Sequence, residues 1–167
     1  TYNAAGHNLD YGHGRINAFR AVTLALQTVH RNGLRRTDQD GDRLAELPVR
    51  SPWGLGTLEY RRSGITSLAM AANGSRFNGW LLNTVDNRFP QQGDFVGDRR
   101  GEVLVTSPWG IGVLQRDAAS YRALMLAPNG TRFGGWLLNT ADNRFGPVGD
   151  FDGDGRQEIL VRSPWGI

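Results

Sequence analysis

The 167-residue sequence predicts a mainly β protein built of repeated units and preceded by one α-helix. The repeat is the main observation. Ser51-Pro52-Trp53-Gly54 recurs at 107–110 and at 163–166, so each copy begins 56 residues after the last. Trp80-Leu81-Leu82-Asn83-Thr84 returns at 136–140 with the same offset. A fixed period of this length is typical of one supersecondary unit repeated along the chain.

The repeat divides the chain into four parts. They are a leading segment, a first repeat, a second repeat and a partial third repeat, at 1–36, 37–92, 93–148 and 149–167. Because the third repeat stops just after its first strand, we expect a truncated array. Assembly of several chains into a ring and an open array are the alternatives.

Short apolar runs within the repeats predict the strands. They lie at 102–106, 112–116, 122–127 and 159–162, with a fourth strand of the second repeat carrying Phe133 and 136–140. Asn129-Gly130 predicts a type I′ hairpin turn, and 142–149 a polar connection to the next repeat. Four strands in about 56 residues is the size of a propeller blade. The predicted fold is therefore tandem four-stranded propeller-type blades, two complete and a third partial.

The leading segment has a different periodicity. Ile16, Phe19, Val22, Leu26 and Val29 recur at three- and four-residue spacing, which predicts a helix over about residues 15–30. A helix with one apolar stripe needs a packing partner, and the repeats are a poor one. We therefore expect its partner to lie elsewhere.

Carboxylates stand at alternate positions at the start of each repeat. The first and third repeats carry full sets at loop positions one, three, five and nine: Asp38, Asp40, Asp42 and Glu46, and Asp150, Asp152, Asp154 and Glu158. Gly41 and Gly153 allow the sharp turn that makes these side chains converge. Converging like charges are unfavourable without a cation, and Ca²⁺ takes six to eight oxygens, including a backbone carbonyl here expected from Leu44 or Arg156.

The second repeat carries an incomplete set. Asp94, Asp98 and Glu102 are present, but Val96 stands at position three and cannot act as a ligand. We therefore expect two calcium sites and a third that is weaker or absent. The alternative is that these segments are simply polar turns between strands.

Composition excludes several kinds of site. The chain has no cysteine, so a metal must be bound by oxygen or histidine. Its longest apolar stretch, at 21–26, is far shorter than the roughly 20 residues of a membrane span. All 19 basic side chains are arginine, but there is no basic helix or nucleic-acid motif, so we expect no nucleic-acid partner and no membrane span.

The third acidic segment resembles a known repeat. Asp150-Phe151-Asp152-Gly153-Asp154-Gly155, followed by Glu158-Ile159-Leu160, is similar to the calcium loop of FG-GAP or VCBS-type repeats. The resemblance extends in register from residue 37 to the end of the chain. It implies calcium-binding loops in a β-propeller that serves as an adhesion or accessory module, and a secreted or extracellular location.

A second resemblance lies in the leading segment. The stretch 11–22, Tyr-Gly-His-Gly-Arg-Ile-Asn-Ala-Phe-Arg-Ala-Val, looks like the end of the catalytic domain of subtilisin-like serine proteases. This implies an upstream protease domain as a partner in the parent chain. The family's Gly-Thr-Ser-Met-Ala type motif is not present, and 67–71 is not a version of it. We therefore assign no catalytic residue and expect the chain itself not to be an enzyme.

The tryptophans leave two interpretations open. Trp53, Trp109 and Trp165 offer one aromatic platform per repeat for a sugar ring, which is the basis of a carbohydrate-binding lectin as the alternative function. Repeated aromatic residues also build blade cores, an interpretation favoured for Trp80 and Trp136. The function predicted is a non-catalytic calcium-binding module at the C-terminus of a secreted subtilisin-like protease, which stabilises it or contacts a glycan or protein surface.

Overall fold

The computed structural model describes residues 7–8, 12–13, 37–164 and 166, and the chain forms two compact units, at 1–33 and 34–167. In the first unit, β1 (His7–Asn8) pairs antiparallel with β2 (Gly12–His13). The helix predicted at 15–30 lies outside the described residues, and no helix is among the elements described. That part of the predicted fold is not borne out. None of the described elements is a helix with the length and apolar character needed to cross a bilayer.

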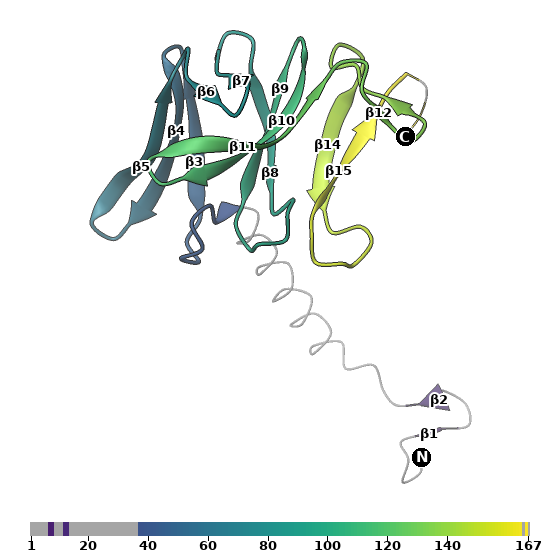
Figure 1. The fold of residues 1–167 in the computed structure, drawn as a ribbon. Helices are drawn as coiled ribbons and strands as arrows, with labels where there is room; N and C mark the ends of the chain where they lie inside the picture. The colour runs from purple at the N-terminus through teal and green to yellow at the C-terminus, as the bar shows by residue number, and fades with distance from the viewer. Residues whose placement is uncertain (1–6, 9–11, 14–36, 165, 167) are drawn as a thin grey trace. The chain divides into compact units, whose positions relative to one another are not determined.

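The second unit is mainly β, as predicted, and all its strand pairs are antiparallel (Figure 1). A three-stranded sheet contains β3 (Glu46–Ser51), β4 (Gly54–Arg61) and β5 (Gly64–Ala72). A four-stranded sheet contains β8 (Arg88–Gly93), β9 (Glu102–Ser107), β10 (Gly110–Asp117) and β11 (Ser120–Pro128). A two-stranded sheet pairs β14 (Arg144–Gly149) with β15 (Glu158–Arg162), and two small hairpins pair β6 (Arg76–Phe77) with β7 (Trp80–Leu81) and β12 (Arg132–Phe133) with β13 (Trp136–Leu137).

The sheets are out of phase with the repeats predicted at 37–92, 93–148 and 149–167. The first strand of the four-stranded sheet is β8, which precedes the acidic segment and was placed at the end of the first repeat. The equivalent strand β14 covers residues that were predicted to be a polar connection. Two complete four-stranded blades were therefore the wrong count. The described residues contain one, because the strand that would complete the first sheet falls before residue 37.

The predicted fourth strand is instead a short hairpin. Phe133 pairs with Trp136 in β12 and β13, and the chain leaves regular strand structure after Leu137. The turn before it is not type I′, because Gly130 has a φ of 91° while the φ of Asn129 is negative. With the hydrogen bond from the Thr131 N–H to the Pro128 carbonyl oxygen, 3.1 Å, this is the pattern of a type II turn. It redirects β11 into the hairpin.

The repeated motifs hold each sheet to its hairpin through one hydrogen-bond network, present twice. In the first copy the Asn73 amide nitrogen donates to the Pro52 carbonyl oxygen at 2.8 Å, and the Thr84 hydroxyl donates to the Ser51 carbonyl oxygen at 2.7 Å. The second copy repeats both bonds with Asn129, Pro108, Thr140 and Ser107. The repeated sequence is therefore explained by structure, without a ligand.

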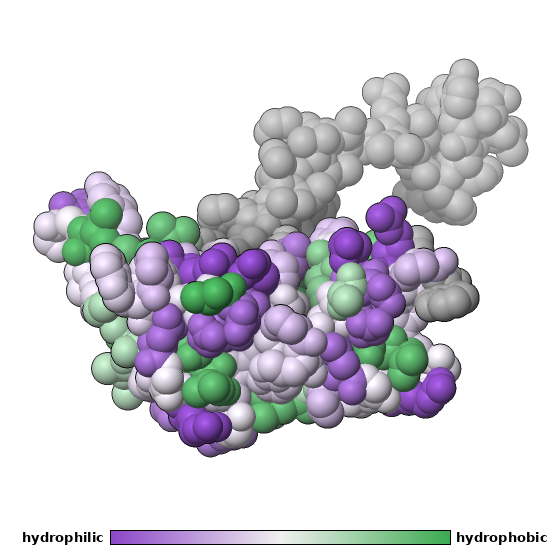
Figure 2. Space-filling view, turned by 90° about the horizontal axis from the view of Figure 1, so that it is seen from above, coloured by the Kyte–Doolittle hydropathy of each residue, from purple (hydrophilic) through white to green (hydrophobic). Residues whose placement is uncertain are grey.

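The main core lies between the three-stranded and four-stranded sheets. Trp80 is fully buried in it and stacks on Trp109, with ring centroids 4.4 Å apart. Phe77 meets Tyr121 edge to face at 5.8 Å. The buried members of this cluster are Leu55, Ala69, Ala71, Phe77, Trp80, Leu82, Val105, Leu114, Tyr121 and Ala123. By contrast, the face shown in Figure 2 is mostly hydrophilic, with apolar residues in separate patches.

The glycine of the repeated Ser-Pro-Trp-Gly motif is required by close backbone approach. A Cβ on Gly110 would lie 2.3 Å from the carbonyl oxygen of Ala127 on β11. We expect Gly110→Ala to lower the free energy of unfolding by about 2 kcal/mol or more, because backbone must move to admit the methyl group. Gly135→Ala is the control, since its Cβ meets nothing within 4 Å. Urea unfolding compares the two, and equal losses would contradict the expectation.

Candidate metal centre

The three acidic loops lie at the same end of the second unit (Figure 1). The loop before β3 contains residues 38–45, the loop between β8 and β9 contains 94–101, and the loop between β14 and β15 contains 150–157. Each loop ends at a glutamate that opens the next strand. The antiparallel meander places them together, since every second strand connection returns to the same edge.

The loops share one internal hydrogen-bond pattern. The first aspartate accepts from the backbone N–H of the glycine three residues on, at 2.6 to 2.7 Å in the pairs Asp38–Gly41, Asp94–Gly97 and Asp150–Gly153. These glycines have φ angles of 86°, 80° and 83°, which confirms the predicted sharp turn. The final glutamate accepts from the second loop residue, as Glu102 does from the Phe95 N–H at 2.8 Å. The pattern folds each loop back toward its own acids.

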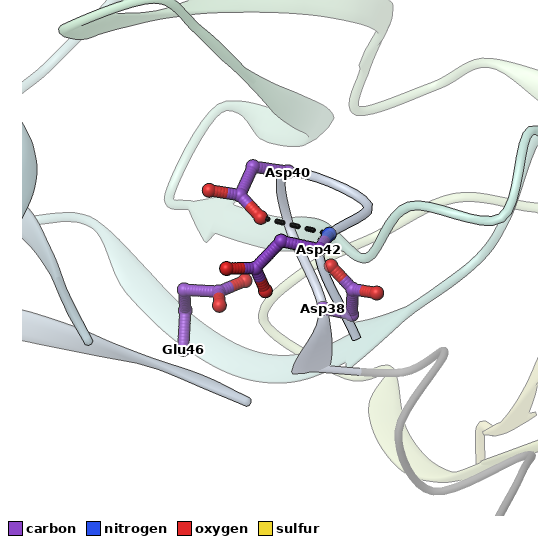
Figure 3. A group of neighbouring side chains, drawn as sticks. All are labelled: Asp38, Asp40, Asp42 and Glu46. Atoms are coloured by element: carbon purple, nitrogen blue, oxygen red, sulfur yellow. Dashed lines mark hydrogen bonds between the residues drawn. The ribbon is translucent and has the colours of Figure 1, made fainter. Parts of the chain in front are cut away.

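The first loop brings its four predicted acids together. Carboxylate oxygens of Asp38, Asp40, Asp42 and Glu46 lie within 4.8 Å of one another. Figure 3 shows the four side chains gathered around the turn, with the Asp42 N–H donating to Asp40 at 3.1 Å. Glu46 is buried, and its Oε1 has no hydrogen-bond partner. An all-oxygen set with one unsatisfied buried oxygen fits a hard cation such as Ca²⁺.

The third loop gathers three of its four acids. Asp150, Asp152 and Glu158 have oxygens within 4.8 Å of one another, and Asp154 is not part of this group. Asp154 instead accepts a hydrogen bond from the Arg156 N–H at 2.7 Å. The equivalent bond in the first loop runs from the Leu44 N–H to Asp42 at 2.8 Å. Calcium ligation by the Leu44 and Arg156 carbonyl oxygens stays a prediction.

The second loop is closed in another way. Among the described residues, Asp94, Asp98 and Glu102 form no such close group of three. The amide nitrogen of Gln115 on β10 donates to Asp98 Oδ2 at 2.7 Å and to Glu102 Oε1 at 3.0 Å. An uncharged donor therefore bridges two of the predicted ligands. This adds a second reason, besides Val96, to expect weak calcium binding there.

The final glutamates of the first two loops carry strongly shifted acidity. Burial raises the pKa of Glu46 from 4.5 to about 7, and the nearby Asp40, Asp38 and Asp42 add to the rise. Burial likewise raises the pKa of Glu102 to about 7, against the lowering effect of hydrogen bonds from Gln115 and Phe95. Both carboxylates are therefore costly to ionise in the folded chain without a cation.

Arginines from neighbouring strands contact the acids of the first loop. Arg116 on β10 lies 3.1 Å from Asp40, which connects the four-stranded sheet to this loop. Arg61 on β4 lies 3.0 Å from Asp42 and also pairs with Glu59. These guanidinium groups offset part of the negative charge.

Successive loops are joined to each other through their backbones. The Gly101 N–H donates to the Asp38 carbonyl oxygen at 2.5 Å, and the Gln157 N–H donates to the Asp94 carbonyl oxygen at 2.9 Å. The two bonds are 56 residues apart in both partners, so they follow the repeat. Each covers the first aspartate of the preceding loop, which explains why Asp38 and Asp94 are buried while Asp150 is exposed.

The tryptophans do not form equivalent platforms. Trp53 is 80% exposed, whereas Trp109 is 42% exposed and stacks on Trp80. Trp165 lies outside the described residues. The indole nitrogen of Trp80 donates to Asn87 at 3.1 Å, and that of the half-buried Trp136 to Asn143 at 3.4 Å. Packing, the interpretation favoured for Trp80 and Trp136, holds fully for Trp80 and in part for Trp136.

Comparison with known proteins identifies the repeat type at the end of the chain. Residues 144–167 match the FG-GAP repeat. The match begins with β14 and contains the third acidic loop and β15, so its start coincides with the strand that opens the sheet. A search of curated proteins and one of solved structures found no match.

Sequence reasoning missed two residues beside the acidic loops. Gln115 bridges two acids of the second loop, and Glu59, in the same repeat position, is buried next to the first. Neither belongs to the matched FG-GAP repeat. The available signal was the 56-residue offset between them, which places a carboxylate and an amide at one position of otherwise similar strands.

Proposed function

We propose that this chain is a non-catalytic calcium-binding module of FG-GAP-type repeats. The observation that carries the proposal is the first loop, where four carboxylates approach within 4.8 Å and Glu46 keeps one buried oxygen unsatisfied. The FG-GAP match at 144–167 supports it for the third loop. In this proposal the first and third loops bind Ca²⁺ and the second binds it weakly or not at all.

Calcium would stabilise the loop end of each sheet. It offsets the repulsion between converged carboxylates, and because it binds the folded loop it stabilises the folded chain by mass action. The backbone bonds between successive loops extend this effect from one sheet to the next. The module would therefore be most rigid where calcium is abundant, as outside the cell.

Calorimetric titration of calcium into chelator-treated chain, with a parallel thermal melt, tests this function. We expect two binding events and a higher melting temperature, with about 2.7 kcal/mol of stabilisation per site at 100 times its Kd. Asp38→Asn and Asp150→Asn should each remove one event. Asp117→Asn, which changes an acid outside the loops, is the control. Absence of heat and of any shift in a folded chain would reduce the loops to polar turns.

The location and parentage are further proposals. The resemblance of 11–22 to the end of a subtilisin-like catalytic domain supports a secreted protease as the parent, with the repeats as its stabilising or surface-binding tail. Most of this stretch lies outside the described residues. An upstream coding sequence with an Asp, a His and a Gly-Thr-Ser-Met-Ala type motif would support the parentage. Hydrolysis of casein by this chain alone would contradict its non-catalytic role.

The exposure of Trp53 favours one alternative function. Trp53 borders a groove on the three-stranded sheet that is also lined by Leu55 and Met70. An exposed indole beside such a groove is suited to stacking on a sugar ring. Glycan-dependent changes in tryptophan fluorescence that Trp53→Ala abolishes would support a lectin, whereas no change across a broad glycan panel would count against it.

A further inference from the structure

The chain contains an internal comparison on the middle strands of its two larger sheets. Glu59 on β4 and Gln115 on β10 are 56 residues apart and occupy the same repeat position. Both side chains are buried, each at 1% exposure. Glu59 lies directly opposite Glu46 in the β3–β4 register, and Gln115 contacts Glu102, the counterpart of Glu46. One position beside the final acid of a loop is thus a carboxylate in one sheet and an amide in the other.

Gln115 satisfies the second loop without a cation. Its Nε2 donates to Asp98 and Glu102, while its Oε1 accepts from Arg122 at 2.5 and 3.1 Å. Arginine only donates hydrogen bonds, so Arg122 fixes which end of the amide faces the acids. The Glu102 Oε1 therefore has a donor, and Glu102 leaves no unsatisfied buried oxygen.

Glu59 cannot do the same for the first loop, because an ionised carboxylate has no hydrogen to donate. Opposed residues of an antiparallel pair present their side chains on one face, about 5 Å apart at Cβ, so Glu59 and Glu46 point the same way. Arg61 contacts both Glu59 and Asp42, which places the Glu59 carboxylate beside the cluster. The Oε1 atoms of Glu46 and of Glu59 both lack any hydrogen-bond partner.

Two buried carboxylates with one unsatisfied oxygen each require a positive group between them, since leaving buried charge unpaired is strongly unfavourable. We propose that Glu59 is a fifth carboxylate ligand of the divalent cation bound by Asp38, Asp40, Asp42 and Glu46. In the second loop the Gln115 amide occupies the corresponding place and excludes a cation. This inference rests on the proposed function, and it names the residue position that separates a binding loop from a closed one.

Calcium calorimetry on the full chain tests the role of Glu59. The background variant Asp152→Asn removes the third-loop event, so the remaining event belongs to the first loop. Adding Glu59→Gln should weaken that event by at least about tenfold, because a ligand charge is lost. The new amide should also bridge the acids as Gln115 does, so the melting temperature without calcium should rise. This second measurement shows directly that the variant folds.

The second loop provides the reciprocal test. Val96→Asp alone should create no strong site, because Gln115 still bridges Asp98 and Glu102. Val96→Asp combined with Gln115→Glu should add a calcium-binding event absent from the parent chain. A full-strength site from Val96→Asp alone, or an unchanged first-loop affinity in Glu59→Gln, overturns the inference while leaving the proposed function intact. A parent chain that binds no calcium overturns both.

Discussion

Replacing Trp80 by alanine is expected to lower the free energy of unfolding by about 4 kcal/mol, the range for truncating a fully buried tryptophan. Trp80 comes from the β6–β7 hairpin but is buried in the core shared with the four-stranded sheet, where it stacks on Trp109. A Cβ on Gly112 of β10 would lie 2.8 Å from its ring, so the sheet is closely fitted to it. Its loss opens a cavity between two sheets and leaves Asn87 without its indole donor.

The equivalent residue one repeat later is the control for this prediction. Trp136 has the same place in the β12–β13 hairpin and the same type of bond to Asn143, but it is only half-buried. We expect Trp136→Ala to cost about 1 to 2 kcal/mol, in proportion to the smaller area that it buries. Urea unfolding of both variants measures the difference. Equal losses would show that contact between sheets contributes little to stability.

The repeat made much of the fold predictable. The strands expected at 102–106, 112–116, 122–127 and 159–162 are present in β9, β10, β11 and β15. Their apolar, β-branched residues carry information about local structure that survives without tertiary context.

The phase of the sheets was not predictable from the same patterns. Residues 144–149 contain two glycines, a proline and an arginine, so they look like a connection, yet they form β14 because β15 supplies the backbone partners. Trp136 and Leu137 looked like the start of a full strand, but their apolar side chains serve a two-residue hairpin. In both places pairing decided the structure, and pairing is not encoded in local composition.

The candidate site was predictable where the ligands are close in sequence. The convergence of Asp38, Asp40, Asp42 and Glu46 follows from alternate spacing and a glycine turn. Glu59 and Gln115 come from the adjacent strand and enter the site only through the register of β4 and β10, so spacing within the loop gave no sign of them. Asp154 shows the opposite failure, since correct spacing did not bring it into the third group.

Raising the pH is expected to destabilise the chain when calcium is removed. The folded-state pKa of Glu46 and that of Glu102 are about 7, against 4.5 for an exposed glutamate. Between these values the folded chain binds more protons than the unfolded chain, so the free energy of unfolding falls as the pH rises from about 4.5 to about 7. Each group contributes about 3 kcal/mol to this fall. Urea unfolding in chelator from pH 5 to 8 measures it.

Calcium should remove only one of the two contributions. Bound Ca²⁺ requires an ionised Glu46, so it eliminates that group's preference for a proton. Glu102 faces the Gln115 amide instead of a cation, so its contribution should persist in saturating calcium. Glu102→Gln should then flatten the remaining slope, whereas Glu46→Gln should flatten only the slope measured in chelator. A stability that is independent of pH in chelator would contradict the assigned burial of both carboxylates, and complete flattening by calcium would show that the second loop also binds the ion.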